Sequence, residues 1–144
     1  MAAAAATERC FLWPLRVYYE DTDAGGVVYY ANYLRFMERA RTEWLRALGH
    51  EQDRIAEERG VLFVVRGASL EYRRPARFND RLEVLSQIGQ HSRTSLTFEQ
   101  TVRLAGPQGA VLCEGTVRVV CVERGRWRPR PIPKDILAEL TVDR

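Results

Sequence analysis

Hydrophobic residues recur every three or four positions between residues 29 and 48, and this spacing predicts one long amphipathic helix. Charged residues fill the opposite face, and Gly49 follows the last apolar position, where glycine commonly ends a helix. The apolar stripe consists of Tyr30, Tyr33, Met37, Ala40, Trp44 and Ala47, widened by Leu34, Leu45 and Leu48.

Most of the remaining chain has patterns typical of β-strands. A short strand is predicted over residues 15–20, and a second, shorter helix over residues 51–59, closed by Gly60. Four further strands are then expected, separated by turn residues, over residues 61–72, 80–88, 93–104 and 110–123. The last of these runs is apolar on both faces, which predicts an interior strand, and Pro133 opens a final helical turn.

One strand, one long helix and four consecutive strands predict an α+β fold. In this fold an antiparallel sheet of about five strands wraps around the single long helix. A chain of 144 residues suffices for one domain and its core. We therefore expect a flexible N-terminal arm over residues 1–10 and a single domain over residues 11–144.

Composition and charge exclude some classes of protein and leave others open. Hydrophobic residues make up 46% of the chain and charged residues 28%, which is ordinary for a globular domain. The net charge of +3 suits a polyanionic partner such as nucleic acid or a phosphate-bearing small molecule, and it is equally common in proteins with neither. Because the basic residues are dispersed and no known motif occurs, nucleic-acid binding is not expected.

The three cysteines, Cys10, Cys113 and Cys121, are odd in number and have no Cys-x-x-Cys spacing. This pattern favours reduced thiols in a cytoplasmic protein over a disulfide framework or a zinc site. The first residues lack the basic region of a secretory signal, and no apolar run approaches the roughly 20 residues of a membrane span. We therefore expect no metal and no membrane span.

The acidic loop before the long helix is the segment with the clearest candidate chemistry. A helix start leaves about four backbone N–H groups without partners and carries partial positive charge. A substrate carbonyl can be polarised there while Asp23 acts on it, and Gly25 and Gly26 allow a tight turn and a close approach of substrate. The alternative is that Asp23 only forms an Asx-type turn or helix cap, and Asp21 is expected to be structural.

The same segment resembles the signature of hotdog-fold acyl-CoA thioesterases in the 4-hydroxybenzoyl-CoA thioesterase-like family. The subgroup it resembles most is the thioesterases associated with the Tol-Pal system. The resemblance covers most of residues 12–124, and it rests on the run from Tyr19 to Arg41, on Gly60-Val-Leu-Phe-Val-Val, and on Tyr72-Arg-Arg-Pro-Ala-Arg-Phe-Asn-Asp80.

The resemblance implies a hotdog fold and hydrolysis of an acyl-CoA thioester to a free acid and CoA, with no cofactor. It assigns Asp23 as the catalytic carboxylate, acting as base or nucleophile, and the backbone N–H of Tyr30 as the donor to the thioester oxygen. Tol-Pal-associated members usually have histidine at the position of Tyr30, whereas the hydroxybenzoyl-CoA enzyme has tyrosine there.

The resemblance also implies residues that bind substrate. Arg93 and Ser95 fall where family members contact the nucleotide, often across a subunit boundary, and arginine forks suit phosphate groups. Val64 and Val65 resemble a wall of the acyl pocket, and Gly26 lies where substrate approaches. A solvated charge at Arg93 and core packing at the two valines explain these residues equally well.

Because hotdog domains generally pair sheet edges, a homodimer or homotetramer is implied, with a possible acyl-carrier protein or Tol-Pal link. Two other functions stay open: a non-catalytic acyl-CoA or acyl-carrier binding module, and a hotdog dehydratase. A dehydratase would need a paired histidine and aspartate, and neither His50 nor His91 stands out for that role.

Overall fold

The computed structural model describes residues 10–141 of the chain. The expected N-terminal arm lies outside the described residues except for Cys10, which is the first residue of a strand. In chain order, the elements are β1 (Cys10–Arg16), the 3-10 turn η1 (Tyr19–Asp21), α1 (Asn32–Ala47), α2 (Gln52–Arg59), β2 (Val61–Tyr72), β3 (Arg81–His91), β4 (Ser95–Leu104), β5 (Val111–Glu123) and α3 (Lys134–Thr141).

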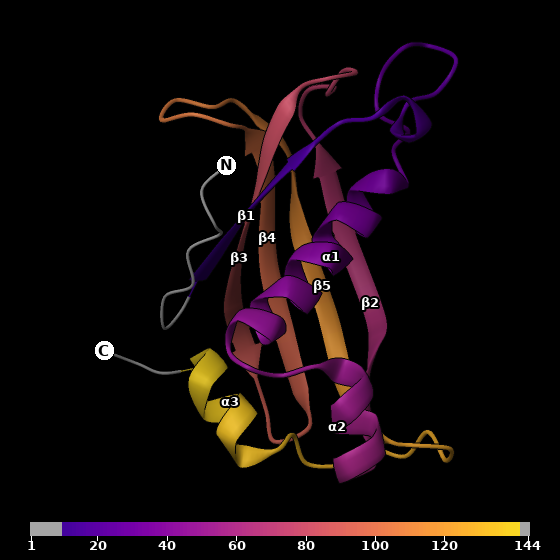
Figure 1. Ribbon diagram of the computed structural model, residues 1–144, viewed down its shortest axis with the longest axis vertical. Coiled ribbons are helices and arrows are strands. Elements are labelled where there is room, and N and C mark those ends of the chain that lie inside the picture. Colours follow the sequence, from indigo (N-terminus) through magenta and orange to yellow (C-terminus); the bar gives the residue numbers. More distant parts are fainter. Residues whose placement is uncertain (1–9, 142–144) are drawn as a thin grey trace.

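The five strands form one sheet in the order β1-β3-β4-β5-β2, and every neighbouring pair is antiparallel. Strands β1 and β2 are therefore the two edges. The helix α1 lies across one face of this sheet, and α2 leads from its end into β2 (Figure 1). This arrangement confirms the predicted α+β fold, with five antiparallel strands and one long central helix.

The predicted boundaries agree with the structure for the long helix and for the four later strands, within three residues at each end. The first strand is the exception, because it spans Cys10–Arg16 and not residues 15–20. Pro14 lies inside β1 and pairs with Glu83, which is tolerated because β1 is an edge strand. After Val17 the chain turns into η1, where the backbone N–H of Tyr18 donates to the carboxylate of Asp21. The strand prediction at residues 17–20 was therefore wrong.

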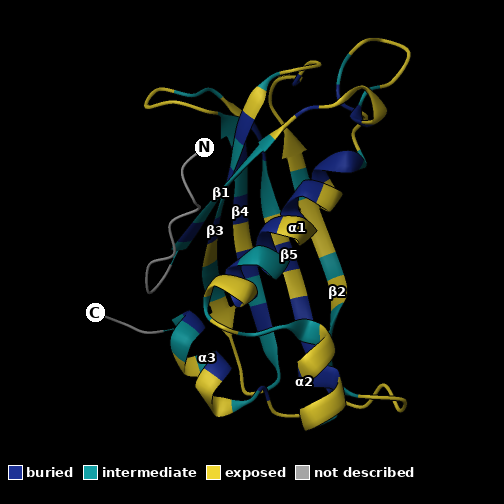
Figure 2. Ribbon diagram, in the orientation of Figure 1, coloured by how far each residue is buried: buried dark blue, intermediate teal, exposed yellow. Residues whose placement is uncertain are grey.

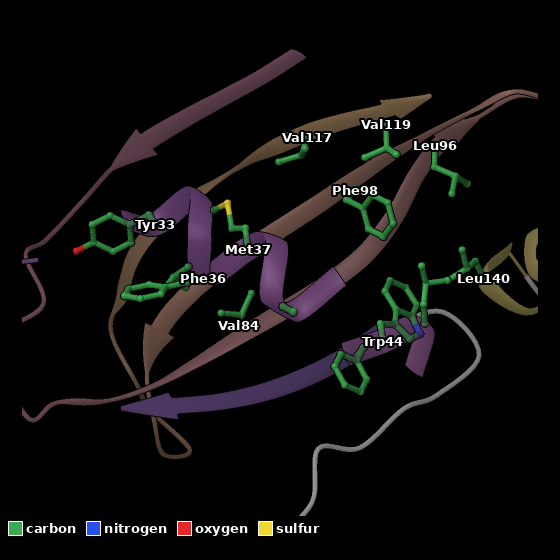
Figure 3. Packing of buried hydrophobic residues seen from close by; sticks show 14 of the residues in the cluster. Tyr33, Phe36, Met37, Trp44, Val84, Leu96, Phe98, Val117, Val119 and Leu140 are labelled. Carbon is green, nitrogen blue, oxygen red and sulfur yellow. The ribbon is translucent and has the colours of Figure 1, made fainter. Parts of the chain in front are cut away.

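The core lies between α1 and the sheet. Phe36, Met37, Ala40 and Trp44 lie on one face of α1 and are fully buried. Figure 2 shows buried and exposed residues alternating along α1, and Figure 3 shows Met37 and Trp44 among side chains of the sheet. The ring of Trp44 stacks on Phe11 of β1, which fixes the helix against the edge of the sheet as well as its centre.

The two C-terminal elements complete this core. Strand β5 has neighbours on both sides, β4 and β2, as its apolar residues on both faces predicted. The expected final helical turn is the helix α3, whose Ile136 and Leu140 are buried. Leu140 packs in the same region as Trp44 (Figure 3). The described chain from β1 to α3 therefore shares one hydrophobic core.

Candidate active site

The loop between η1 and α1 folds back on itself as a narrow hairpin. The backbone N–H of Asp23 donates to the carbonyl of Val27 at 2.9 Å, and Thr22 pairs with Val28. Gly26 has a φ of +81°, a left-handed conformation that glycine adopts at little cost. The N–H of Val28 also donates to the carbonyl of Ala76 at 2.9 Å, so the loop is attached to the connection between β2 and β3.

Asp21 holds this loop against the start of α1. Its buried carboxylate accepts a hydrogen bond from the N–H of Tyr18 at 2.8 Å. Its backbone carbonyl accepts two more, one from the N–H of Tyr29 and one from the side-chain amide of Asn32, both at 2.9 Å. These contacts agree with the structural role expected for Asp21.

Asp23 has an exposed side chain at the tip of the same hairpin. Its Oδ1 accepts a hydrogen bond from the N–H of Gly25 at 2.8 Å, which is the Asx-type turn weighed above. Among residues 10–141, no group donates to the second carboxylate oxygen, Oδ2. The turn therefore fixes the carboxylate in place and leaves one of its oxygens open to solvent or substrate.

Tyr29 lies close to this carboxylate. The pKa of Tyr29 is raised, mainly by hydrogen bonding with Tyr30 and to a small extent by the negative charge of Asp23. Asp23 therefore interacts electrostatically with Tyr29, one of the residues that lead into α1.

Unpaired backbone donors lie just before the start of α1. Within the described part of the chain, the N–H groups of Tyr30 and Ala31 donate to no protein acceptor. They lie inside a turn closed by the N–H of Asn32 and the carbonyl of Tyr29, 2.8 Å apart. Such groups at the positive end of a helix can bind a developing oxyanion.

A group of tyrosine rings surrounds these donors. The ring of Tyr30 lies 4.8 Å from that of Tyr29 and 6.1 Å from that of Tyr72, between ring centroids, and it remains 61% exposed. Tyr33 is only 3% exposed, and its hydroxyl accepts a hydrogen bond from the N–H of Ala76 at 3.2 Å. Burial raises the pKa of Tyr33. Tyr33 is therefore a core residue, in agreement with its place in the apolar stripe of the predicted helix.

The two valines expected in the acyl pocket face different sides of β2. Val65 lines a cavity of about 280 Å³ between α1 and the sheet, together with Phe63. Val64 lies between them in the strand and so points to the other face, because successive residues alternate. The cavity wall also includes the charged residues Glu38 and Arg41. Of the two valines, only Val65 is in a position to contact an acyl group in this cavity.

Arg93 and Ser95 lie at the far end of the sheet from Asp23, in and after the turn between β3 and β4. Figure 1 shows this turn at the bottom and the loop before α1 at the top. The β4 strand has ten residues, which at about 3.3 Å each separates its two ends by about 30 Å. Arg93 is exposed, and the hydroxyl of Ser95 is hydrogen-bonded to that of Ser92 at 2.8 Å. One chain therefore does not bring Arg93 and Ser95 to Asp23.

Among the described residues, three side chains have ligand atoms close enough to hold a metal ion: His50, Asp135 and Glu139. Each has a partner within the protein. Nε2 of His50 lies 3.2 Å from the carboxylate of Glu139, and Asp135 forms a two-pronged pair with Arg59 at 2.6 and 2.8 Å. Hydrogen bonds from Arg59 lower the pKa of Asp135 to about 2. These pairs attach α3 to α2 and to the end of α1, so the cluster is accounted for by helix packing.

A curved antiparallel sheet around one helix, with a carboxylate loop at the helix start, defines the class of hotdog-fold thioesterases. The chain belongs to the thioesterase-like superfamily, whose family model matches residues 17–140. It is 50% identical over 129 residues to acyl-CoA thioester hydrolase YbgC of Escherichia coli, covering 90% of this chain and 94% of that protein.

A second relative supports the same family, and a solved structure supports the fold. Acyl-CoA thioesterase YbgC of Haemophilus influenzae is 42% identical, over 89% of this chain and 92% of its own length. A solved mutant of 4-hydroxybenzoyl-CoA thioesterase, in complex with 4-hydroxybenzoyl-CoA, superposes with a TM-score of 0.85. It covers 92% of this chain and 99% of its own, and at 19% identity it establishes the fold alone.

Two residues of this site were not singled out from the sequence. Asn32 attaches the helix start to the loop through its side-chain amide, and the hydroxyl of Tyr72 donates to the carbonyl of Tyr30 at 3.1 Å. An asparagine near a helix start commonly signals a cap, whereas here its amide donates to the carbonyl of Asp21. Nothing in the local sequence around Tyr72 indicates its partner, because the two residues are 42 positions apart.

None of the described helices is long and apolar enough to cross a membrane.

Proposed function

We propose that this protein hydrolyses acyl-CoA thioesters at the start of α1, with Asp23 as the reacting carboxylate and the N–H of Tyr30 as a donor to the thioester oxygen. The family is the thioesterase-like superfamily, and relatives 50% and 42% identical to this chain are named acyl-CoA thioester hydrolase and acyl-CoA thioesterase. The observation that carries the assignment to these residues is the unpaired N–H of Tyr30 on the same short loop as the exposed Asp23.

The chemistry requires an attacking oxygen and a place for negative charge. As a general base, Asp23 removes a proton from water while the water oxygen bonds to the thioester carbon. The carbonyl oxygen becomes an oxyanion, stabilised by the N–H of Tyr30. The C–S bond then breaks, and Asp23 passes the proton that it took from water to the CoA thiolate. As a nucleophile, Asp23 would bond to the carbon first, the C–S bond would break to release the CoA thiolate, and water would then cleave the resulting anhydride to give the free acid and the Asp23 carboxylate.

Substrate binding is proposed to require a second copy of the chain. Strand β2 is an edge of the sheet, so its outer side is able to pair with β2 of another subunit. Such pairing offers a route by which Arg93 and Ser95 of one subunit approach the CoA bound at Asp23 of another. We therefore propose a homodimer or homotetramer, in the cytoplasm, where the buried thiols Cys113 and Cys121 would remain reduced. An acyl-carrier protein or Tol-Pal link stays a prediction from family resemblance.

The test is turnover of a panel of aliphatic and aromatic acyl-CoAs. The release of the free thiol of CoA measures the rate. The Asp23→Asn variant is expected to lose at least 100-fold in kcat while its circular dichroism and melting temperature stay unchanged. Asp53→Asn, an exposed aspartate on α2, is the matched control and is expected to retain the wild-type rate.

Three outcomes would contradict the proposal. Equal rates for Asp23→Asn and wild type would remove Asp23 from the mechanism. CoA binding by the wild type without thiol release would indicate a binding module. Loss of water from a hydroxyacyl-CoA without thiol release would indicate a dehydratase.

A further inference from the structure

The hydroxyl of Tyr72 contacts the peptide that leads into α1. Tyr72 is the last residue of β2, and its Oη donates to the backbone carbonyl of Tyr30 at 3.1 Å. This carbonyl belongs to the same planar peptide unit as the N–H of Ala31, and in a trans peptide the two point in opposite directions. A hydrogen bond that fixes the Tyr30 carbonyl therefore also fixes the direction of the Ala31 N–H.

The preceding peptide, between Tyr29 and Tyr30, is also fixed by a hydrogen bond to its carbonyl. The carbonyl of Tyr29, which shares a peptide unit with the N–H of Tyr30, accepts a hydrogen bond from the N–H of Asn32 at 2.8 Å. Ala31 has φ −69° and ψ −20°, so this turn is of the helical kind. Helical backbone aligns successive N–H groups along the helix axis. The unpaired N–H groups of Tyr30 and Ala31 therefore point the same way, each with its carbonyl partner fixed.

Resting on the function proposed above, we infer that the oxyanion site has two donors, the N–H groups of Tyr30 and Ala31, and that Tyr72 is the positioning residue for the second. Oxyanion sites commonly combine donors in this way, because one thioester oxygen accepts more than one hydrogen bond as it gains charge. The bond from Tyr72 also polarises the peptide, since linked hydrogen bonds strengthen one another.

The surroundings of Tyr72 suit this role. Its ring packs edge-on against Tyr30 and Tyr33, with centroids 6.1 and 5.6 Å away, which limits the positions of the hydroxyl. Burial, followed by the nearby Cys113 and Tyr30, raises the pKa of Tyr72. The phenol therefore keeps its proton, and remains a donor, throughout the neutral and mildly alkaline range.

The test removes the hydroxyl and keeps the ring. Tyr72→Phe is expected to lower kcat by about three- to tenfold, with KM within twofold of wild type. The reason is that the variant loses stabilisation of the transition state and not of the bound substrate. Tyr19→Phe, which removes the hydroxyl of a 75% exposed tyrosine stacked on Phe78, is the control and is expected to keep the wild-type rate. Replacing Tyr72 by 4-aminophenylalanine restores a donor on the same ring and is expected to recover most of the lost rate.

A spectroscopic measurement separates positioning from a general loss of structure. A CoA ketone, in which CH₂ replaces the thioester sulfur, binds without being hydrolysed, and the stretching frequency of its ¹³C-labelled carbonyl reports the hydrogen bonds to that oxygen. We expect a smaller downward shift in Tyr72→Phe than in wild type, and a wild-type shift in Tyr19→Phe. An unchanged frequency or an unchanged kcat in Tyr72→Phe would overturn the inference.

This measurement is independent of the role of Asp23. If Asp23→Asn retained full activity, the assignment of the carboxylate would fail, while the ketone frequency would still decide the role of Tyr72. If the amino-substituted ring failed to restore both the rate and the frequency shift, Tyr72 would act through packing alone and the inference would be wrong.

Discussion

Arg41 of the central helix donates a hydrogen bond to the side-chain oxygen of Gln100, at 3.0 Å, in the middle of the sheet. The amide of Gln100 in turn donates to the carbonyl of Met37 and to the hydroxyl of Ser86, both at 2.9 Å. The guanidinium lies 5.8 Å from the ring centre of Phe98, and burial lowers the pKa of Arg41. One buried polar network therefore joins α1 to β3 and β4.

The first prediction concerns this network. Gln100→Met keeps the volume of the side chain and removes the acceptor of Arg41, leaving a buried charge with fewer partners. We expect a loss of about 2–4 kcal/mol in the free energy of unfolding, measured by urea denaturation. Gln87→Met, at an exposed glutamine of β3, is the control and should change the stability by less than about 0.5 kcal/mol. Equal urea midpoints for the two variants would contradict the prediction.

The second prediction compares two glycines in the same backbone conformation. Gly26 and Gly60 have φ values of +81° and +70°, and an added Cβ would meet no atom within 4 Å at either position. Alanine at either residue should cost about 1–2 kcal/mol, because the left-handed conformation is strained for it. Only Gly26→Ala should also lower kcat/KM, since Gly26 lies in the loop that carries Asp23. The check is turnover of one acyl-CoA by both variants; equal loss of activity would refute it.

The third prediction concerns the buried thiols. Burial raises the pKa of both Cys113 and Cys121 from 9.0 to about 11, so little thiolate forms near neutral pH. In a Cys10→Ser background, neither thiol should react with a disulfide reagent at pH 8 while the protein is folded. Both should react at once in denaturant. Rapid labelling of the folded protein at pH 8 would show that these residues are more accessible than their burial indicates.

The fourth prediction concerns acid stability. Because Arg59 lowers the pKa of Asp135 from 3.8 to about 2, the pair stabilises the folded protein above pH 4. This contribution is lost as the pH falls toward 2. The side chain of Asp135 is 46% exposed, so screening by solvent limits the effect to under about 1 kcal/mol.

The measurement is the difference in urea midpoint between wild type and Asp135→Asn. The difference should narrow between pH 5 and pH 3. Asp53 has no ion-pair partner among residues 10–141. The urea midpoint of Asp53→Asn should therefore differ little from that of wild type at every pH. If the difference in urea midpoint between wild type and Asp135→Asn became larger in acid, the direction of this pKa shift would be contradicted.

Much of the fold follows from local patterns along the chain. The three- and four-residue spacing of apolar residues located α1, and turn residues located the four later strands. The family, and the acyl-CoA thioesterase activity that goes with it, were also correctly predicted from the motif around Asp23. The first strand was misplaced because the run from Val17 to Glu20 has the composition of a strand, while Pro14 obscured the true one.

The candidate site was only partly predictable. Asp23 and Tyr30 share one short loop, so the sequence alone was enough to associate them. The sequence grouped Val64 with Val65, whereas the pleat of β2 sends them to opposite faces. The family resemblance placed Arg93 and Ser95 at the nucleotide, often across a subunit boundary, and within one chain the length of the sheet does separate them from Asp23. Long-range geometry of this kind depends on strand pairing, which local patterns do not specify.

The sequence by itself determined the elements, the class of fold and the loop that carries the candidate carboxylate, because these depend on periodicity and on residues close together in the chain. Only the tertiary structure decided which backbone N–H groups stay unpaired, which valine faces the cavity, and that Tyr72 reaches the carbonyl of Tyr30. The reason is physical: hydrogen bonds across the fold join residues distant in the chain, and their partners are set by the register of the sheet and the packing of α1 against it.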